Sequence, residues 1–381
     1  MVREKSQALE LTLDLAKPCM KIKRYSSFDD LPESSLALFV DASTDAGIFL
    51  SLPWFRNLTE TVPEIAQRLR IYSVESDATS GVPTMLLPMC HDRLAKGFFT
   101  PRHLSAAANF YSALFNPVTG STSASVQSDM NALAVAIAAE RPCWDTVDLH
   151  PMSPGSPLYA YAMDAFRHAG MLVDCYFCFG NYYLEVKGRC YQEYAETLPS
   201  TLKNTLKRKA RQLENPHELR IKLITTVDEI AEGIAVYEAV YASSWKSPEP
   251  YLAFMPGLIR TCAEMGCLRM GVAYVGDQPA AAQIWMVYNG VASIYKLAYD
   301  EQFAKLSVGS LLTSHLMQHV IDVDQVREVD YLMGDEPYKQ DWMSARRERW
   351  GMIAFNPRSV RGLLAALRHF GGRAWRVLKK P

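Results

Sequence analysis

Three apolar segments separated by two tight-turn signals constrain the fold of this chain more than any other feature. They are "CLRMGVAYV" (residues 267–275), "AAAQIWMVY" (280–288) and "VASIYKLAY" (291–299). "GDQP" joins the first pair and "NG" joins the second, and both are typical of β-hairpins. An amphipathic helix from about Val308 to Ile321 follows, and then a strand in "REVDYLMG". This order predicts an antiparallel meander that continues through a helix into a further strand.

The first half of the chain repeats this order more loosely. Strands in "LRIYSVES" and "VPTMLLPMC" precede a helix in "VQSDMNALAVAIAAE", which leads to a strand in "WDTVDLH". With 381 residues, the chain is long enough for two domains. We therefore expect an α/β (α+β) protein with two domains of one plan, each a mixed, mostly antiparallel sheet flanked by helices.

Composition argues against several other classes of protein. The net charge is -1, so bulk electrostatic attraction to nucleic acid is not indicated. No run of 18 apolar residues predicts a membrane-spanning helix, and the N-terminal residues lack the apolar core of a signal peptide. The eight cysteines lie scattered, mostly within apolar segments, which is typical of reduced thiols. We therefore expect a cytoplasmic protein.

A joint of small residues, Leu306–Ser310 ("LSVGS"), lies directly before the helix of the second half. A helix start leaves about four backbone N–H groups without intrahelical partners, and the helix dipole adds partial positive charge there. Gly309, Ser307 and Ser310 are small enough to leave this backbone accessible. Ser307 can also cap the helix, and Lys305 supplies a charge beside it. The joint predicts an anion site; the alternative is simple chain reversal, because neither a Walker loop nor a GxGxxG motif is present.

Two stretches around this joint resemble a known family. "YKLAYDEQFAKLSVGSLL" (295–312) followed by "VDYLMGDEPYKQDW" (329–342) is similar to the acetyltransferase domain of the GNAT superfamily found in CelD-like and BioF2-like proteins. "SSWK" at Ser243–Lys246 is similar to this family as well. The resemblance covers residues 190–357, and Val308 stands where proline is common. Tandem GNAT domains of this kind also resemble the FemAB-like aminoacyl transferases.

The resemblance implies acyl-CoA, either acetyl-CoA or a longer acyl-CoA, as co-substrate. Its diphosphate would lie against the amides of Leu306–Leu311. Its pantetheine arm would lie between two splayed parallel strands, Val291–Tyr299 and Arg327–Met333. The residues implied to bind this group are Lys305, Leu306, Ser307, Val308, Gly309, Ser310 and Leu311.

The resemblance also implies a domain organisation. Residues 190–357 would form the acyltransferase domain and would begin with a basic connecting helix at 190–215. Residues 1–189 would form a degenerate GNAT-like domain, because its own joint at Asn116–Ser121 carries Pro117 and is a weaker cradle. Residues 358–381 would form a tail.

Acyl transfer to an amine or hydroxyl requires that the acceptor lose a proton and that the thioester oxygen and the leaving thiolate be stabilised. Asp330 is the candidate for taking the proton, and Lys296, on the neighbouring strand, is expected to meet it. Tyr338, in the loop after the last of these strands, is a candidate for hydrogen bonding the substrate or protonating the thiolate. The alternatives are a structural Lys296–Asp330 ion pair and a packing role for Tyr338.

Five further residues are candidates for binding the acceptor substrate. They lie at or just after predicted strand ends, where ligands of α/β sheets often bind. No histidine or cysteine pattern predicts a metal site, since Cys175 and Cys178 lie in a strand that places them on opposite faces. The five acceptor candidates are His150, Asp335, Glu336, Lys339 and Trp342.

Two basic segments suggest contacts with anionic partners. The predicted connecting helix at 190–215 is either a solvated surface or a site for phosphate or an acidic polymer. Residues 357–381 hold seven Lys or Arg and no Asp or Glu, and their apolar residues recur at helical spacing. This tail either docks on the protein itself or lies on an anionic membrane, which would place the protein at the inner face.

These observations support three functions. The first is an N- or O-acyltransferase that moves an acyl group from acyl-CoA to an amine or hydroxyl of a sugar, lipid or small metabolite, in exopolysaccharide or cell-envelope biosynthesis. The second is a FemAB-like transferase that uses aminoacyl-tRNA, which the basic segment at 190–215 would suit. The third is a non-catalytic GNAT-like scaffold in a polysaccharide assembly.

Overall fold

The computed structural model describes residues 11–12, 20–76, 82–92, 100–120, 125–213 and 219–378. The chain divides into two compact units: unit 1 comprises residues 1–178 and 348–381, and unit 2 comprises residues 179–347. Two long strands, β8 (Leu172–Glu185) and β14 (Ala345–Phe355), each begin in one unit and end in the other.

These boundaries differ from the predicted division at residues 189 and 357. The end of β8 pairs with β13 (Glu328–Asp330), so residues 179–189 join unit 2. Most of β14 pairs with β7 (Thr146–Met152), so residues 348–357 join unit 1. A strand belongs to the sheet that satisfies its backbone groups, and the sequence periodicity of β8 and β14 carries no information about that partner.

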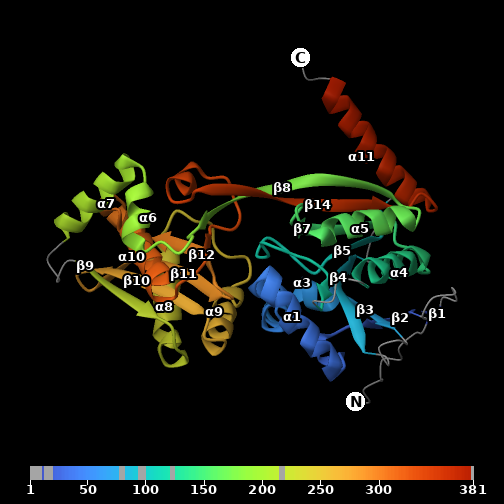
Figure 1. Ribbon diagram of the computed structural model, residues 1–381, viewed down its shortest axis with the longest axis horizontal. Coiled ribbons are helices and arrows are strands. Elements are labelled where there is room, and N and C mark those ends of the chain that lie inside the picture. The colour runs from blue at the N-terminus through green and yellow to red at the C-terminus, as the bar shows by residue number, and fades with distance from the viewer. Residues whose placement is uncertain are drawn as a thin grey trace. The chain divides into compact units, whose positions relative to one another are not determined.

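Unit 1 is built on a mixed sheet (Figure 1). Its strand pairs β2–β3 and β3–β4 are antiparallel, and its β5–β7 pair is parallel. A short strand, β6 (Val118–Thr119), pairs with β4. The strands in sheet order are β1 (Leu11–Thr12), β2 (Met20–Tyr25), β3 (Leu69–Ser76), β4 (Pro83–Asp92), β5 (His103–Ala106), β7, β14 and β8.

The helices α4 (Val126–Ala139) and α5 (Pro157–His168) pack together against this sheet (Figure 1). Their small apolar residues, such as Ala134 and Ala162, allow close approach, and both are fully buried. The predicted cradle at Asn116–Ser121 contains β6, so part of it is a strand paired with β4; Ser121 itself lies outside the described residues. The remaining helices of unit 1 are α1 (Leu36–Ala46), α2 (Leu52–Thr61), α3 (Pro63–Arg68) and α11 (Val360–Leu378).

Unit 2 contains the meander predicted from the sequence. Both turns have the expected backbone, since Gly276 has φ 58°, and Asn289 and Gly290 have φ 47° and 72°. Beyond β12 the parallel partner β13 follows, and then the end of β8. The antiparallel strands are β9 (Leu219–Ile224), β10 (Leu268–Val275), β11 (Gln278–Tyr288) and β12 (Val291–Tyr299).

Helices enclose this second sheet. The predicted helix is observed as α10 (Val308–Gln318), which packs Leu312 and Leu316 against Trp285 of β11 in one core. Helix α8 (Ile230–Ala242) contacts β10 and β11 as well, and α9 (Phe254–Glu264) contacts β10.

The predicted connecting helix at 190–215 is two helices rather than one. They are α6 (Tyr191–Thr197) and α7 (Ser200–Gln212). Pro199 separates them, because proline excludes the helical conformation for the residue before it and lacks an N–H group. None of the described helices is long and apolar enough to cross a membrane.

Candidate functional site

The start of α10 is a sharp turn in the backbone of unit 2. A 3₁₀-helix (Glu301–Leu306) ends at Ser307, whose φ of 56° lies in the left-handed region, and α10 begins at Val308. Ser307 does not cap the helix through its side chain, contrary to the prediction, because its left-handed backbone replaces the extended conformation of a capping residue. After this bend, the N-terminal turn of α10 has no side-chain cap from Ser307.

The accessible amides are fewer than the predicted range of Leu306–Leu311. The N–H of Ser307 donates to the oxygen of Ala304, and the N–H of Leu311 donates to the oxygen of Ser307, both at 3.1 Å. The first three residues of α10 have no intrahelical acceptor for their N–H groups. These residues are Val308, Gly309 and Ser310, and the side chain of Val308 is buried in the core.

A buried glutamine fixes this helix end to the sheet. Gln283 of β11 is 1% exposed; its amide nitrogen donates to the oxygen of Gly309 at 2.9 Å and to the hydroxyl of Thr313 at 2.8 Å. The indole of Trp285 donates to the Gln283 oxygen at 2.9 Å, so the glutamine is fully engaged. Gln283 is not among the residues predicted for the site, although one polar residue within the apolar run "AAAQIWMVY" was an available signal.

A cavity of about 350 Å³ opens beside the helix end. It lies entirely within unit 2, and its volume is within the range of small-molecule sites. Gly309 and Ser310 contribute the backbone of the first helical turn to its wall. The other walls include Leu297 and Tyr299 of β12 and, beyond β13, Tyr331 and Tyr338.

The cavity exists because β12 and β13 separate. Their parallel pairing ends at Ser293 and Asp330, and Leu332 then adopts a left-handed φ of 55°. Asp330 holds this turn, since its carboxylate accepts the N–H of Leu332 at 2.6 Å. The amide of Asn181 donates both to Asp330 and to the oxygen of Leu332, the latter at 2.8 Å.

Asp330 is also tied to a cation. Arg347 donates to the carboxylates of Asp330 and Glu328 and, at 2.6 Å, to the side-chain oxygen of Asn181. Asp330 is 5% exposed. Its oxygens are thus occupied by donors from three residues, so Asp330 positions its neighbours.

Lys296 and Asp330 do not meet as predicted. Lys296 instead pairs with Glu249 at 2.6 Å, in the segment that follows α8. The reason is the register: Asp330 lies opposite Ser293, three residues before Lys296, and the two strands diverge from that point. Lys296, further along β12, therefore pairs with Glu249 rather than with a residue of β13.

Lys246 lies near this pair and was not predicted as a functional residue. Within the described part of the chain its ammonium forms no ion pair; it lies 5.6 Å from the centre of the Trp245 ring. Burial lowers the pKa of Lys246 to about 8, and the positive charge of Lys296 acts in the same direction. Trp245 in turn packs on Tyr299, a residue of the cavity wall, with ring centres 4.5 Å apart.

Tyr338 and Trp342 line the cavity as their candidate roles require. Tyr338 is 44% exposed and packs edge-on against Tyr331, with ring centres 5.9 Å apart. Partial burial, together with the charge of Glu336, raises the pKa of Tyr338 to about 12. Such a phenol stays protonated and donates a hydrogen bond, but it is a poor source of a proton for a thiolate. Trp342 is 5% exposed and belongs to the core as well.

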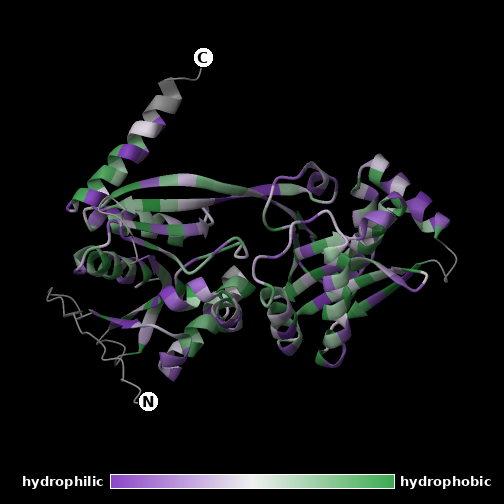
Figure 2. Cartoon of the chain, turned by 180° about the vertical axis from the view of Figure 1, so that it is seen from behind, coloured by the Kyte–Doolittle hydropathy of each residue, from purple (hydrophilic) through white to green (hydrophobic). Residues whose placement is uncertain are grey.

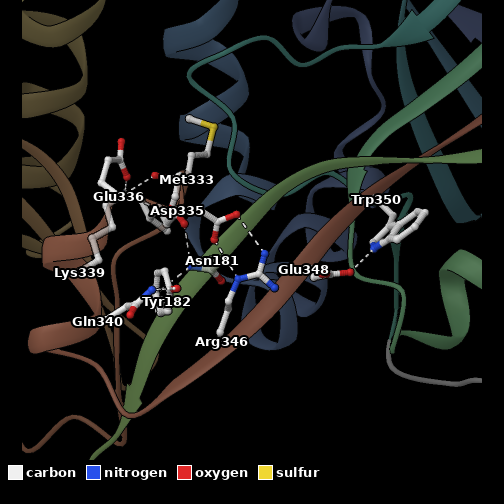
Figure 3. A network of polar contacts seen from close by, with 12 residues as sticks. Asn181, Tyr182, Met333, Asp335, Glu336, Lys339, Gln340, Arg346, Glu348 and Trp350 are labelled. Carbon is white, nitrogen blue, oxygen red and sulfur yellow. Dashed lines mark hydrogen bonds and ion pairs between the residues drawn. The ribbon is translucent and has the colours of Figure 1, made fainter. Parts of the chain in front are cut away.

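The acidic and basic candidates of the loop after β13 pair with one another or with nearby residues. Lys339 is 5% exposed, bonds to the oxygen of Met333 and pairs with Glu336 at 2.7 Å. Asp335 pairs with Arg346 at 2.9 Å (Figure 3). A hydrogen bond from Arg346 lowers the pKa of Asp335. These pairs shape the loop, and each leaves one partner at least partly exposed.

His150 lies in unit 1, whereas all the other predicted site residues lie in unit 2. It follows Asp148 on β7, and its ring nitrogen lies 3.1 Å from that carboxylate. The hydroxyl of Tyr176 donates to the same carboxylate at 2.7 Å. His150 therefore forms a polar cluster with Asp148 and Tyr176 in unit 1, separate from the other predicted site residues.

Comparison with known proteins agrees with this geometry. Residues 200–340 match the family described as the acetyltransferase (GNAT) domain. No curated protein sequence matches the chain. The fold is also similar to that of FemX, with a TM-score of 0.57 and 9% identity over 87% of this chain and 97% of that one.

Two further solved structures have a similar fold. One is the C-terminal domain (DUF2156) of a putative lysylphosphatidylglycerol synthetase from Agrobacterium fabrum, with a TM-score of 0.51 and 12% identity over 82% of this chain and 96% of that one. The other is a conserved protein of unknown function from Bacteroides thetaiotaomicron, with a TM-score of 0.55 and 11% identity over 86% and 98%. The chain therefore has a tandem GNAT, FemAB-like architecture, which confirms the predicted fold class.

Proposed function

We propose that this protein is an N- or O-acyltransferase that moves an acyl group from acyl-CoA to an amine or hydroxyl acceptor. The observation that carries the proposal is the cavity at the free helix end of α10. Three backbone N–H groups and the helix dipole favour an anion there, and apolar and aromatic side chains such as Leu297 and Tyr331 line the rest of the cavity.

Gly309 supports the fit of a diphosphate to this helix end. A Cβ atom at Gly309 would meet only the ring of Tyr299, at 3.4 Å, and the backbone there is not left-handed. Packing within the chain therefore does not demand glycine. The absence of a side chain instead leaves the amides open to a bulky ligand, with exposed Lys305 just before the bend.

The chemistry would be divided among several residues. Bound acyl-CoA supplies the activated thioester. The neutral amine of Lys246 would take the proton of the acceptor as it attacks, because a base with a pKa near 8 is well matched to neutral pH. Tyr338 would donate a hydrogen bond in the cavity. Asp330 would keep the strands apart as a positioning residue, rather than act as the base.

The donor site can be tested by calorimetric titration with CoA and acetyl-CoA. Gly309→Glu places a carboxylate against the helix end, and we expect it to abolish binding while the thermal unfolding temperature stays close to that of the wild type. Gly155→Glu is the matched control, because Gly155 also has open space around it but lies in unit 1. Equal CoA affinity in both variants, or no binding by the wild type, would refute the proposal.

Aminoacyl-tRNA is a second candidate donor, because α7 is strongly basic and buries no side chain completely. Replacing Lys207, Arg208 and Arg211 by Glu would then weaken tRNA binding, make it less dependent on salt concentration, and leave CoA titrations unchanged. Tight binding of charged tRNA together with no binding of CoA would favour this donor. A non-catalytic scaffold would bind neither donor productively.

The acceptor is proposed as an amine or hydroxyl of an exopolysaccharide, a cell-envelope lipid or a related metabolite. Its support is the resemblance to CelD-like proteins, together with a fold shared with a domain of a putative lysylphosphatidylglycerol synthetase. Mass spectrometry of acceptor pools incubated with the protein and labelled acetyl-CoA tests this point.

A further inference from the structure

The helix α11 of unit 1 exposes an unbroken apolar stripe. Its members recur at spacings of three and four residues, so they lie on one face of the helix. Side chains of this size are usually covered in a folded protein when they are contiguous. The stripe consists of Val360, Leu363, Leu364, Leu367 and Phe370, which are 74%, 43%, 43%, 62% and 38% exposed.

A different face of α11 is fixed to unit 1. Ser359 accepts the N–H of Gly362 at 2.9 Å and donates to the buried Asp145 at 2.7 Å, which anchors the first turn. Ala366 is 2% exposed. The ring nitrogen of His369 lies 2.8 Å from a carboxylate oxygen of Asp174 on β8. Two stripe residues also contact unit 1, since Phe370 packs edge-on against Phe355 with ring centres 5.9 Å apart and Leu364 lines a hollow with Pro101 and Phe355. Val360 and Leu367, at 74% and 62% exposed, are the part of the stripe most open to solvent.

The charged side chains of α11 and of the residues flanking it in the sequence are all basic. Residues 357–381 contain seven Lys or Arg and no Asp or Glu. Arg361 and Arg368 are seven residues apart and therefore follow the same flank of the helix. Figure 2 shows hydrophobic and hydrophilic residues alternating along α11. An apolar stripe flanked by arginines is the pattern of a helix that lies in the interface of an anionic bilayer.

We propose that α11 is an interfacial helix that binds an anionic lipid surface, with the stripe in the acyl boundary and the arginines at the headgroups. A second copy of the chain is the less suitable occupant. Two α11 helices paired through their stripes would bring rows of arginine together, and the segment offers no carboxylate to balance them. This inference does not depend on the proposed catalytic function.

The full-length chain can be tested by co-sedimentation with vesicles of phosphatidylcholine alone or mixed with phosphatidylglycerol. We expect binding to the mixed vesicles that weakens with salt, and little binding to phosphatidylcholine. The double variant Leu363→Glu/Leu367→Glu should lose binding, and Arg368→Gln should weaken it about fivefold, as expected for one arginine near an anionic surface.

Leu252→Glu is the matched control, because Leu252 is 78% exposed and lies in unit 2. It should bind mixed vesicles as the wild type does. Equal sedimentation with both vesicle types, or equal loss in the control and the double variant, would overturn the proposal. So would a wild type that ignores vesicles but forms an oligomer that the double variant abolishes, since the stripe would then be an interface between copies.

Discussion

The amine of Lys246 has the most functionally suggestive environment among the described lysines. Its neighbours Lys296 and Lys339 each have a carboxylate partner, Glu249 and Glu336, whereas Lys246 rests over an indole ring. Burial, and then the charge of Lys296, lower its pKa to about 8 from the ordinary value of 10.5. Folding thus favours the neutral amine, and the stability contributed by this group rises with pH between about 8 and 10.5.

The first prediction concerns this titration. Competitive labelling with acetic anhydride, mapped by peptide mass spectrometry, should modify Lys246 with a midpoint near pH 8, since only the neutral amine reacts. Lys296→Met should move the midpoint upward, because it removes a positive charge and releases Glu249. An unchanged midpoint would show that the charge of Lys296 does not lower the pKa of Lys246.

The same titration should govern acyl transfer. We expect the rate to rise with pH up to about 8 in the wild type. Lys246→Arg keeps a positive charge that cannot be lost, so it should abolish that rise while leaving CoA affinity unchanged. A variant that retained the rise would exclude Lys246 as the base.

The second prediction concerns Asp330 and Arg347. Asp330→Ala removes a buried acceptor from Arg347, from Asn181 and from the N–H of Leu332, so it should destabilise the protein by about 3 kcal/mol. Adding Arg347→Met should cost less than the sum of the single changes, with a coupling of about 1–3 kcal/mol. Urea unfolding followed by tryptophan fluorescence measures both quantities, and additive effects would show that the pair does not act as a unit.

The secondary-structure elements differ in whether local sequence or tertiary contacts determine where they begin. The hairpin β11–β12 is specified by Asn289 and Gly290, whose left-handed backbone is a local property. The start of α10 depends on Gln283 as well, a residue that is distant in sequence. The start of α11 depends on close packing, because a Cβ atom on Gly362 would lie 2.2 Å from the backbone oxygen of Asn356.

The third prediction follows from that contact. Gly362→Ala should destabilise the docking of α11 by about 1–3 kcal/mol, because backbone atoms cannot move aside as a flexible side chain can. Gly371→Ala on the same helix is the control; its surroundings are open, so it should stabilise the helix by up to about 1 kcal/mol. Hydrogen exchange of the α11 amides measures both effects. Equal protection in the two variants would show that the contact at Gly362 is relieved easily.

At the scale of the molecule, the two units are interdependent through their strands. Unit 1 receives β14 from the end of the chain, between β7 and β8. Unit 2 receives the end of β8, which pairs with β13. Unit 1 is therefore built from two separate segments of sequence, whereas unit 2 is the continuous segment 179–347.

The fourth prediction tests this arrangement by truncation. A chain that ends at Pro357 keeps β14 and loses only α11, so it should fold and bind CoA like the full chain. A chain that ends at Ser344 loses an interior strand of unit 1, and we expect that unit to unfold. Circular dichroism and two-dimensional amide spectra distinguish the outcomes. A native unit 1 in the shorter chain would show that β14 is dispensable.

Much of the fold could be predicted from the sequence because the signals were local. Turn residues marked the meander, helical periodicity marked α10, and the small residues at Leu306–Ser310 marked a free helix end. The cavity beside that end was expected only through the resemblance to the GNAT superfamily. Two of the candidate site residues, Tyr338 and Trp342, line this cavity, and their proposed roles stay predictions.

The sequence alone thus determined the strands, the turns and the position of the helix start, since each depends on residues that are adjacent along the chain. Tertiary structure decided which side chains share a site. Asn181 and Asp330 are separated by 149 positions, and nothing local indicates that they meet. It also decided that Lys296 pairs with Glu249, because a partner is chosen by strand register and divergence, which are properties of the folded sheet.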